Sequence, residues 1–202
     1  MAQGLDLIHL DKWIRDYVPA FEGDLTAVKF AGGQSNPTFK LTAGGNSYVL
    51  RRKPMGTLLA SAHAVDREFK VLSALAPTNV PVPVPIALCE DDNVIGSMFY
   101  IMEYLGGRVF WDPALPEVSD EDRAAIYDQM NQVMADMHCV DVHQVGLSDY
   151  GKPGNYFERQ IGRWTKQYRA AETETISAME KLIDWLPGNM PADDSRVSLV
   201  HG

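Results

Sequence analysis

Apolar and polar residues alternate with a period of two in several stretches of the first half of the chain, which predicts β-strands. Gly44-Gly45-Asn46 separates two of these stretches and predicts a hairpin turn, because Gly and Asn adopt positive φ at little cost. A polar turn is also expected at residues 91–93. Short connections indicate a mostly antiparallel sheet of about five strands. The predicted strands are residues 25–30, 38–42, 48–52, 86–90 and 98–104.

A second pattern, with apolar residues three and four positions apart, predicts helices. One helix is inserted between the third and fourth strands, where the apolar series is Ala62, Val65, Phe69, Leu72 and Leu75. After residue 105 the chain becomes mainly helical, and Ser119 followed by three acidic residues predicts a capped helix start. The other predicted helices are residues 7–17, 156–170 and 176–186, the last stopped by Pro187-Gly188, and residues 197–202 fit a short strand.

The helix after Ser119 carries a stripe of methionines, which is more typical of a core than of a cofactor contact. His138 follows this stripe, and we interpret it as a structural histidine, since no second ligand stands at helical spacing. The residues expected on the buried face are Ile126, Met130, Val133, Met134 and Met137.

These elements define an α+β protein with two lobes. Residues 1–104 form a lobe with a five-stranded antiparallel sheet and one inserted helix, and residues 105–202 form a linker and a partial, mainly helical lobe. Leu105-Gly106-Gly107-Arg108 breaks the strand pattern and marks the linker.

Composition narrows the class of protein. The 202 residues are 46% hydrophobic, which supports a folded core, and the net charge of -9 disfavours a nucleic acid partner. Neither a signal peptide nor an apolar run long enough to span a bilayer is recognised, so we expect a cytoplasmic protein without membrane contact. Cys89 and Cys139 are expected to be reduced, mostly buried thiols.

Glu68 lies on or beside the apolar face of the inserted helix, where an unpaired carboxylate would be costly. Arg51, at the end of the preceding strand, is the expected partner. Arg52 points to the opposite face of that strand, so we favour Arg51. By itself such a pair is more often a structural salt bridge than a binding site.

Three motifs in this order resemble the nucleotide site of protein-kinase-like folds, namely Gly32–Thr38, Tyr48–Pro54 and Ser61–Glu68. The sequence is most similar to the aminoglycoside phosphotransferase-like family, in the branch related to the kinase-like domain of acyl-CoA dehydrogenase family proteins. The resemblance covers nearly the whole chain. It implies a protein-kinase-like fold that uses ATP and Mg²⁺.

The resemblance also assigns roles to individual residues. A glycine-rich loop would approach the phosphates through backbone N–H groups and side-chain donors, and an arginine would stand where kinases place lysine, held by a helix glutamate. The strand end at residues 102–105 would meet the base, through the carbonyl of Glu103 and the N–H of Leu105. The implied nucleotide-binding residues are Gly33, Gln34, Ser35, Asn36, Arg51, Glu68, Met102, Glu103 and Leu105.

Leu199-Val200-His201-Gly202 resembles the approach to the family's catalytic loop, which carries the aspartate base and the magnesium ligands. We therefore expect catalytic residues and metal ligands beyond Gly202, and we assign none within the chain. The 202 residues alone are then expected to transfer no phosphate and to self-associate through uncovered apolar faces.

The leading interpretation is an ATP-dependent phosphotransferase of a small hydroxylated molecule. Tyr156, Gln160, Trp164 and Tyr168 share one side of a predicted helix, and in the family this region lies towards the acceptor, although aromatic residues at this spacing more often pack a core. The alternatives are a non-catalytic nucleotide- or partner-binding module and a purely structural interaction domain. Nucleotide binding separates the last from the other two.

Overall fold

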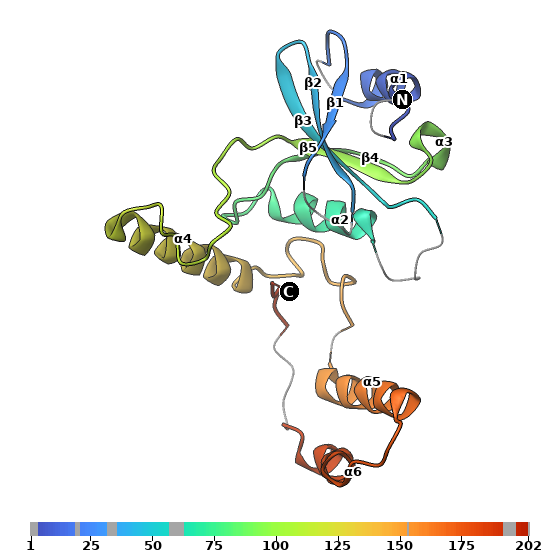
Figure 1. Cartoon of the computed structure of the whole chain (residues 1–202), viewed down its shortest axis with the longest axis vertical. Coiled ribbons are helices and arrows are strands. Elements are labelled where there is room, and N and C mark those ends of the chain that lie inside the picture. The colour runs from blue at the N-terminus through green and yellow to red at the C-terminus, as the bar shows by residue number, and fades with distance from the viewer. Residues whose placement is uncertain are drawn as a thin grey trace. The chain divides into compact units, whose positions relative to one another are not determined.

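The computed structural model describes residues 4–18, 21–31, 36–56, 63–152, 154–191 and 197–201. The chain divides into two compact units, Met1–Met137 and His138–Gly202, and each is described by itself (Figure 1). The predicted lobe boundary between residues 104 and 105 stays a prediction.

The N-terminal unit is built on a five-stranded antiparallel sheet, as predicted. Gly44 and Gly45 have φ of 55° and 85° and form the turn between the second and third strands. A Cβ on Gly44 would lie 2.5 Å from the carbonyl oxygen of Glu22, so a side chain there is excluded. The strands are β1 (Thr26–Lys29), β2 (Thr38–Ala43), β3 (Asn46–Arg52), β4 (Pro85–Cys89) and β5 (Phe99–Glu103), in the order β1-β2-β3-β5-β4.

One face of the sheet is apolar and packs against α1 (Leu7–Tyr17). Leu10 and Ile14 of α1 are fully buried, and the edge of the Trp13 ring meets the Phe99 ring at 4.9 Å between centroids. The short helix α3 (Asp92–Ile95) contacts α1. The predicted polar turn at residues 91–93 is therefore wrong, because the Asp91 carboxylate accepts from the Asn93 N–H and starts a helical turn.

The opposite face of the sheet carries α2 (Val65–Leu75), which contacts β4 and β5 (Figure 1). The rings of Phe69 and Tyr100 lie 5.9 Å apart and join the helix to β5. The helix is inserted between β3 and β4, as predicted, and its sequence neighbour Ala62 lies outside the described residues.

Helix α4 (Asp120–His138) begins as predicted, since the Ser119 hydroxyl accepts from the Asp122 N–H at 3.1 Å. Its predicted buried face is wrong: no residue of α4 is buried, and Met130 is exposed. No helix or strand of the described residues packs extensively against α4, so its apolar stripe stays uncovered.

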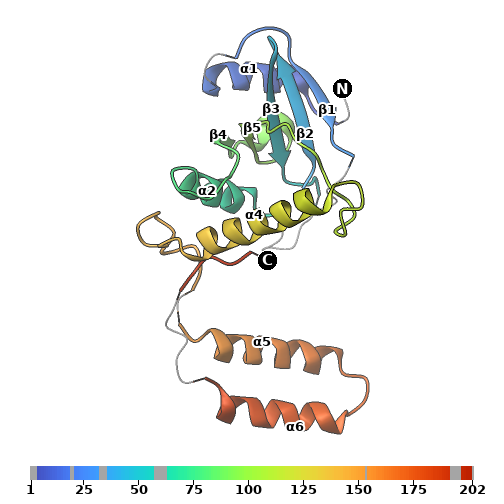
Figure 2. The same ribbon diagram turned by 90° about the vertical axis from the view of Figure 1, so that its left-hand side faces the viewer.

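The C-terminal unit contains a helical hairpin of α5 (Tyr156–Ala171) and α6 (Ser177–Trp185), which lie side by side in Figures 1 and 2. Arg169 of α5 bonds Glu180 of α6 at 2.6 Å. Pro187 and Gly188 do not end the helical path, because they lie in a 3-10 turn, η1 (Leu186–Asn189), that continues from α6. In the described segment 197–201 the predicted strand is absent, and no described strand pairs with it. Over the residues that the structure describes, no helix has the length and apolar character needed to cross a membrane.

Both cysteines are free, but only Cys89 is buried, so the prediction of mostly buried thiols is wrong for Cys139. Burial raises the pKa of the Cys89 thiol. We expect a thiol reagent such as DTNB to label one cysteine of the native chain rapidly and the second only on unfolding. Cys139→Ser should abolish the rapid phase, whereas rapid labelling that survives this substitution would contradict the burial of Cys89.

Candidate nucleotide site

Three polar side chains lie in a row across the sheet on the face that carries α2. Thr38 of β2 stands opposite Arg51 of β3, and Arg51 stands opposite Tyr100 of β5. Residues directly opposite each other in antiparallel strands project to the same face. The row therefore presents a hydroxyl, a guanidinium and a phenol towards α2.

Glu68 of α2 accepts hydrogen bonds from this row. The Arg51 Nε–H donates to Glu68 Oε2 at 2.6 Å, and Nη2 donates to Oε1 at 3.4 Å. The predicted Arg51–Glu68 pair is therefore confirmed. The two side chains are 29% and 33% exposed, so the pair is accessible to a ligand rather than sealed in the core.

Tyr100 and Thr38 make further hydrogen bonds to the Arg51–Glu68 pair, although the sequence analysis did not predict a role for either. The Tyr100 hydroxyl donates to Glu68 Oε2 at 3.1 Å, and the Thr38 hydroxyl accepts from Arg51 Nη1 at 3.2 Å. Burial and the negative charge of Glu68 raise the pKa of Tyr100, so its hydroxyl keeps the proton that it donates. Hydrogen bonds thus orient both terminal nitrogens of Arg51, Nη1 and Nη2, and both carboxylate oxygens of Glu68.

Arg52 projects to the other face of the sheet, as strand alternation predicted. It is only 3% exposed and donates to the Ser97 hydroxyl at 3.0 Å and to the Lys53 carbonyl at 3.3 Å. Burial lowers the pKa of Arg52. Arg52 is therefore enclosed away from the α2 face, as predicted, and the contact of Arg51 with a phosphate stays a prediction.

A second row on the α2 face is mainly apolar. On each strand it lies two residues away from the first row, which contains Arg51. Val28, Lys40, Val49 and Met102 follow one another across β1, β2, β3 and β5. Val28 is exposed, while the Lys40 ammonium lies 4.1 Å from the centre of the Tyr104 ring. An apolar row beside the guanidinium of Arg51 suits a flat aromatic base with an anionic tail.

The remaining predicted residues are placed as follows. Gly33, Gln34 and Ser35 lie outside the described residues. The Glu103 N–H donates to the Val84 carbonyl at 2.9 Å, which fixes the strand end, and Leu105 follows in an exposed segment. Their contacts with a nucleotide stay predictions.

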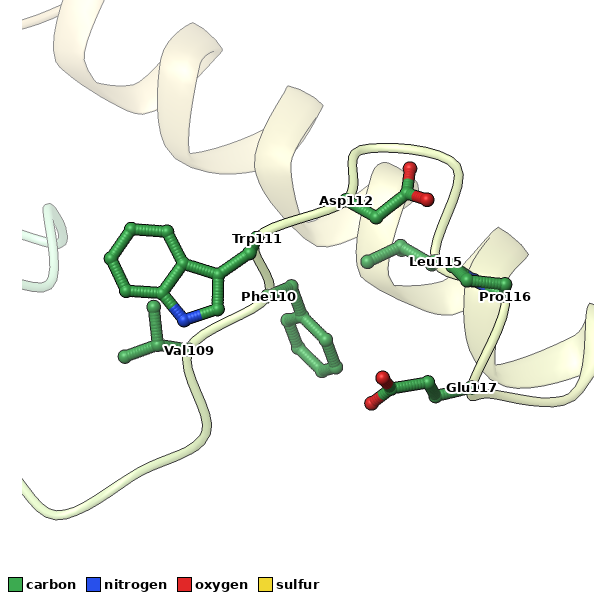
Figure 3. A pocket seen from close by; sticks show the side chains of 7 residues that line it. All are labelled: Val109, Phe110, Trp111, Asp112, Leu115, Pro116 and Glu117. Atoms are coloured by element: carbon green, nitrogen blue, oxygen red, sulfur yellow. The ribbon is translucent and has the colours of Figure 1, made fainter.

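Pockets occur elsewhere in the described part of the chain, and two of them are lined partly by aromatic side chains. One, of about 130 Å³, is lined by residues of the single segment Val109–Glu117 in the N-terminal unit (Figure 3). None of the predicted nucleotide-binding residues or of the residues suggested for the acceptor lines it.

The other pocket, of about 200 Å³, lies between α5 and α6. Its lining includes Gln160, Trp164 and Tyr168, three of the four residues suggested for the acceptor, but not Tyr156. The buried Tyr168 hydroxyl has no hydrogen-bond partner among the described residues. Across the ranges that the structure describes, three or more His, Cys, Asp or Glu side chains nowhere gather closely enough to hold a metal ion.

A five-stranded antiparallel sheet with one inserted helix, and an arginine on β3 paired with a glutamate on that helix, define the N-terminal half of a kinase-like phosphotransferase fold. The sequence profile of the "Phosphotransferase enzyme family" matches residues 26–202. The chain belongs to this family.

Known proteins agree with this assignment. A candidate aminoglycoside phosphotransferase of Ralstonia eutropha is 53% identical, with a TM-score of 0.80 over 95% of this chain and 55% of that chain. Acyl-CoA dehydrogenase family member 10 of Mus musculus is 47% identical over 96% of this chain and 18% of that protein. The GDP complex of aminoglycoside 2'-phosphotransferase-IIIa shares the fold, at 14% identity and a TM-score of 0.55 over 92% of this chain and 59% of that chain. The chain spans 18–26% of the length of the curated relatives it matches.

Proposed function

We propose that this chain forms the nucleotide-covering part of an ATP-dependent phosphotransferase that acts on a small hydroxylated molecule. The observation that carries this proposal is the Arg51–Glu68 pair, held at 2.6 Å beside an apolar row on the same face of the sheet. A salt bridge with a purely structural role would not require an adjacent apolar row or side chains that a ligand can reach. Both features are present here, which favours a binding site.

Arg51 has donors to spare for a phosphate. A guanidinium carries five N–H groups, of which Glu68 and Thr38 accept three through Nε, Nη2 and Nη1. Among the described contacts, two N–H groups remain, one on each terminal nitrogen. They can bind two oxygens of a phosphate group in a fork, which a lysine ammonium in this place would not do.

The base would lie under Val28, Val49 and Met102, and the edge of the base would meet the Glu103 carbonyl and the Leu105 N–H. The backbone of residues 33–36 would approach the phosphates. Mg²⁺ would neutralise the charge of the phosphates. Its protein ligands and the base that takes the acceptor proton belong, in our proposal, to sequence that follows Leu199–Gly202.

The acceptor is proposed to bind the α5–α6 pocket, whose mainly apolar walls and unpartnered Tyr168 hydroxyl suit a small molecule with an apolar body and a polar group. A hydroxyacyl compound is one candidate that the acyl-CoA dehydrogenase relatives suggest. We further propose that the protein works in the cytoplasm and engages neither nucleic acid nor membrane.

The position of the base can be tested by photolabelling. Irradiation with 8-azido-ATP, followed by peptide mapping, should label peptides that contain Val28, Val49 or residues 102–105, and excess ATP should prevent the labelling. Labelling confined to the α5–α6 hairpin or to the Val109–Glu117 segment would overturn the assignment.

Self-association is a separate expectation for the 202-residue chain. Trp164 on α5 and Trp185 on α6 are 62% and 56% exposed, and isolated monomers rarely present such rings together. Light scattering after size-exclusion chromatography should show dimers or larger species whose fraction rises with concentration. Trp164→Gln with Trp185→Gln should shift the chain towards monomer, with Val28→Gln as a control; a strictly monomeric wild type would contradict this expectation.

A further inference from the structure

A buried asparagine joins the end of the glycine-rich motif to α2 and to the residue before its N-cap. Asn36 is only 3% exposed, and its side-chain amide donates from Nδ2 to Glu68 Oε1 at 2.8 Å. The same amide meets the His63 ring, with 3.0 Å between Oδ1 and Nδ1. Both polar atoms of this amide are therefore engaged within the protein.

The chemistry of the partners fixes the direction of each bond. The Glu68 carboxylate, which already receives N–H and O–H donors, acts here as an acceptor, so the asparagine NH₂ must face it. The asparagine oxygen then faces His63, and His63 Nδ1 must carry a proton and donate. The result is a directed chain of hydrogen bonds from His63 through Asn36 to Glu68.

One contact holds the first turn of α2 at Glu68, and the other holds His63, which lies just before the helix. His63 has φ of 64°, an uncommon conformation for a residue with a side chain, and its carbonyl accepts from the Val65 N–H, where α2 begins. Ala64, at the N-cap, provides no side-chain hydrogen bond to the helix. The N-cap residue thus makes no side-chain hydrogen bond that would hold the start of α2. The side chain of Asn36, from outside the helix, holds this region instead.

From this geometry we propose that Asn36 is a positioning residue: its side chain clamps the first turn of α2 and thereby sets the direction in which Arg51 presents its free N–H groups. This inference rests on the proposed nucleotide site for its functional part, and it assigns the Asn36 side chain to Glu68 and His63 rather than to phosphate. The backbone N–H of residue 36 keeps its predicted role at the phosphates.

A double-mutant cycle separates positioning from direct contact. MgATP affinity is measured by calorimetry for the whole chain, for Asn36→Ala, for Glu68→Ala and for the double variant. Asn36→Ala should weaken binding about tenfold, a loss typical of a broken buried hydrogen-bond pair. In the Glu68→Ala background the same substitution should have almost no further effect. An undiminished tenfold loss in that background would show direct phosphate contact and overturn the proposal.

Stability supplies a second readout that needs no nucleotide. Urea unfolding of the same four chains should show coupling, so that the two substitutions together raise the unfolding constant by clearly less than the product of their separate effects. Asn93→Ala, an exposed asparagine in the same unit, should leave both ATP affinity and unfolding unchanged. Additive effects on unfolding would contradict the clamp even if the chain bound no ATP, whereas a wild type without ATP binding would refute only the proposed function.

If Asn36→Ala does not fold, His63→Ala and Tyr100→Phe keep the proposal testable. His63→Ala removes the outer support of Asn36 and should weaken ATP binding by a smaller factor, about threefold. Tyr100→Phe removes one donor to Glu68 while keeping the ring against Phe69. Wild-type ATP affinity and unfolding in His63→Ala would overturn the clamp, and Tyr100→Phe, which leaves both Asn36 bonds intact, shows what the loss of another Glu68 partner costs.

Discussion

Glu68→Ala is expected to lower the free energy of unfolding of the N-terminal unit by about 2 kcal/mol. The substitution removes the acceptor of Arg51, Asn36 and Tyr100 together and leaves their donors without it. A fully buried pair would cost more, but the side chains of Arg51 and Glu68 are about one third exposed, so water and salt recover part of the loss.

Urea unfolding followed by circular dichroism measures this effect. Asp11→Ala is the matched control, because it breaks an arginine–carboxylate pair with Arg15 on α1 that has a similar length of 2.8 Å and similar exposure, but that joins neighbouring turns of one helix without the Asn36 and Tyr100 donors that Glu68 receives. The control should cost less than about 0.5 kcal/mol. Equal effects of the two substitutions would show that the Glu68 cluster contributes no more than a surface pair.

The second large effect concerns phosphate transfer. We expect the 202-residue chain to transfer no phosphate from MgATP to any of a panel of small hydroxylated acceptors. A positioned base contributes about 10²–10⁴ to such a rate, and metal ions stabilise the transferred group further. The resemblance places both beyond the Leu199–Gly202 motif.

A chain extended downstream to the length of the Ralstonia eutropha relative supplies the comparison. Turnover should appear in the extended chain and be lost in its Arg51→Ala variant. The expectation for the short chain fails if its turnover persists through purification and disappears in Arg51→Ala, since the catalytic groups would then lie within the 202 residues.

The sequence predicted the Arg51–Glu68 pair because both signals are local. Strand alternation separates Arg51 from Arg52, and the position of an acid beside a helical apolar face demands a partner. Thr38 could also have been found: a two-residue turn at Gly44-Gly45 places residue 38 opposite residue 51 once the strands are aligned.

Tyr100 could not be found in this way. Its register against Arg51 depends on a connection of more than forty residues that contains α2 and β4, and no local turn fixes it. The same holds for the His63 contact with Asn36, which needs the tertiary position of the start of α2.

Two of the wrong predictions, the strand at residues 197–202 and the buried face of α4, share one cause: a residue pattern forms a strand or a buried face only where another element packs against it. The alternation at residues 197–201 predicted a strand, but no described strand pairs with it. The apolar stripe of α4 predicted burial, yet the helix buries none of its residues. Asp91, by contrast, acts as a local helix cap, and the rules for capping would have predicted α3.

Titration calorimetry with MgATP tests most directly whether Arg51 is the phosphate-binding residue of a nucleotide site. Three chains are compared: wild type, Arg51→Ala, and Arg15→Ala, which removes an arginine of the same unit from the opposite side of the sheet. Arg51→Ala should weaken ATP binding at least tenfold and leave adenosine binding nearly unchanged, because the guanidinium faces phosphate and not the base. Arg15→Ala should bind ATP like the wild type. Equal affinities of the wild type and Arg51→Ala for ATP would contradict the assignment.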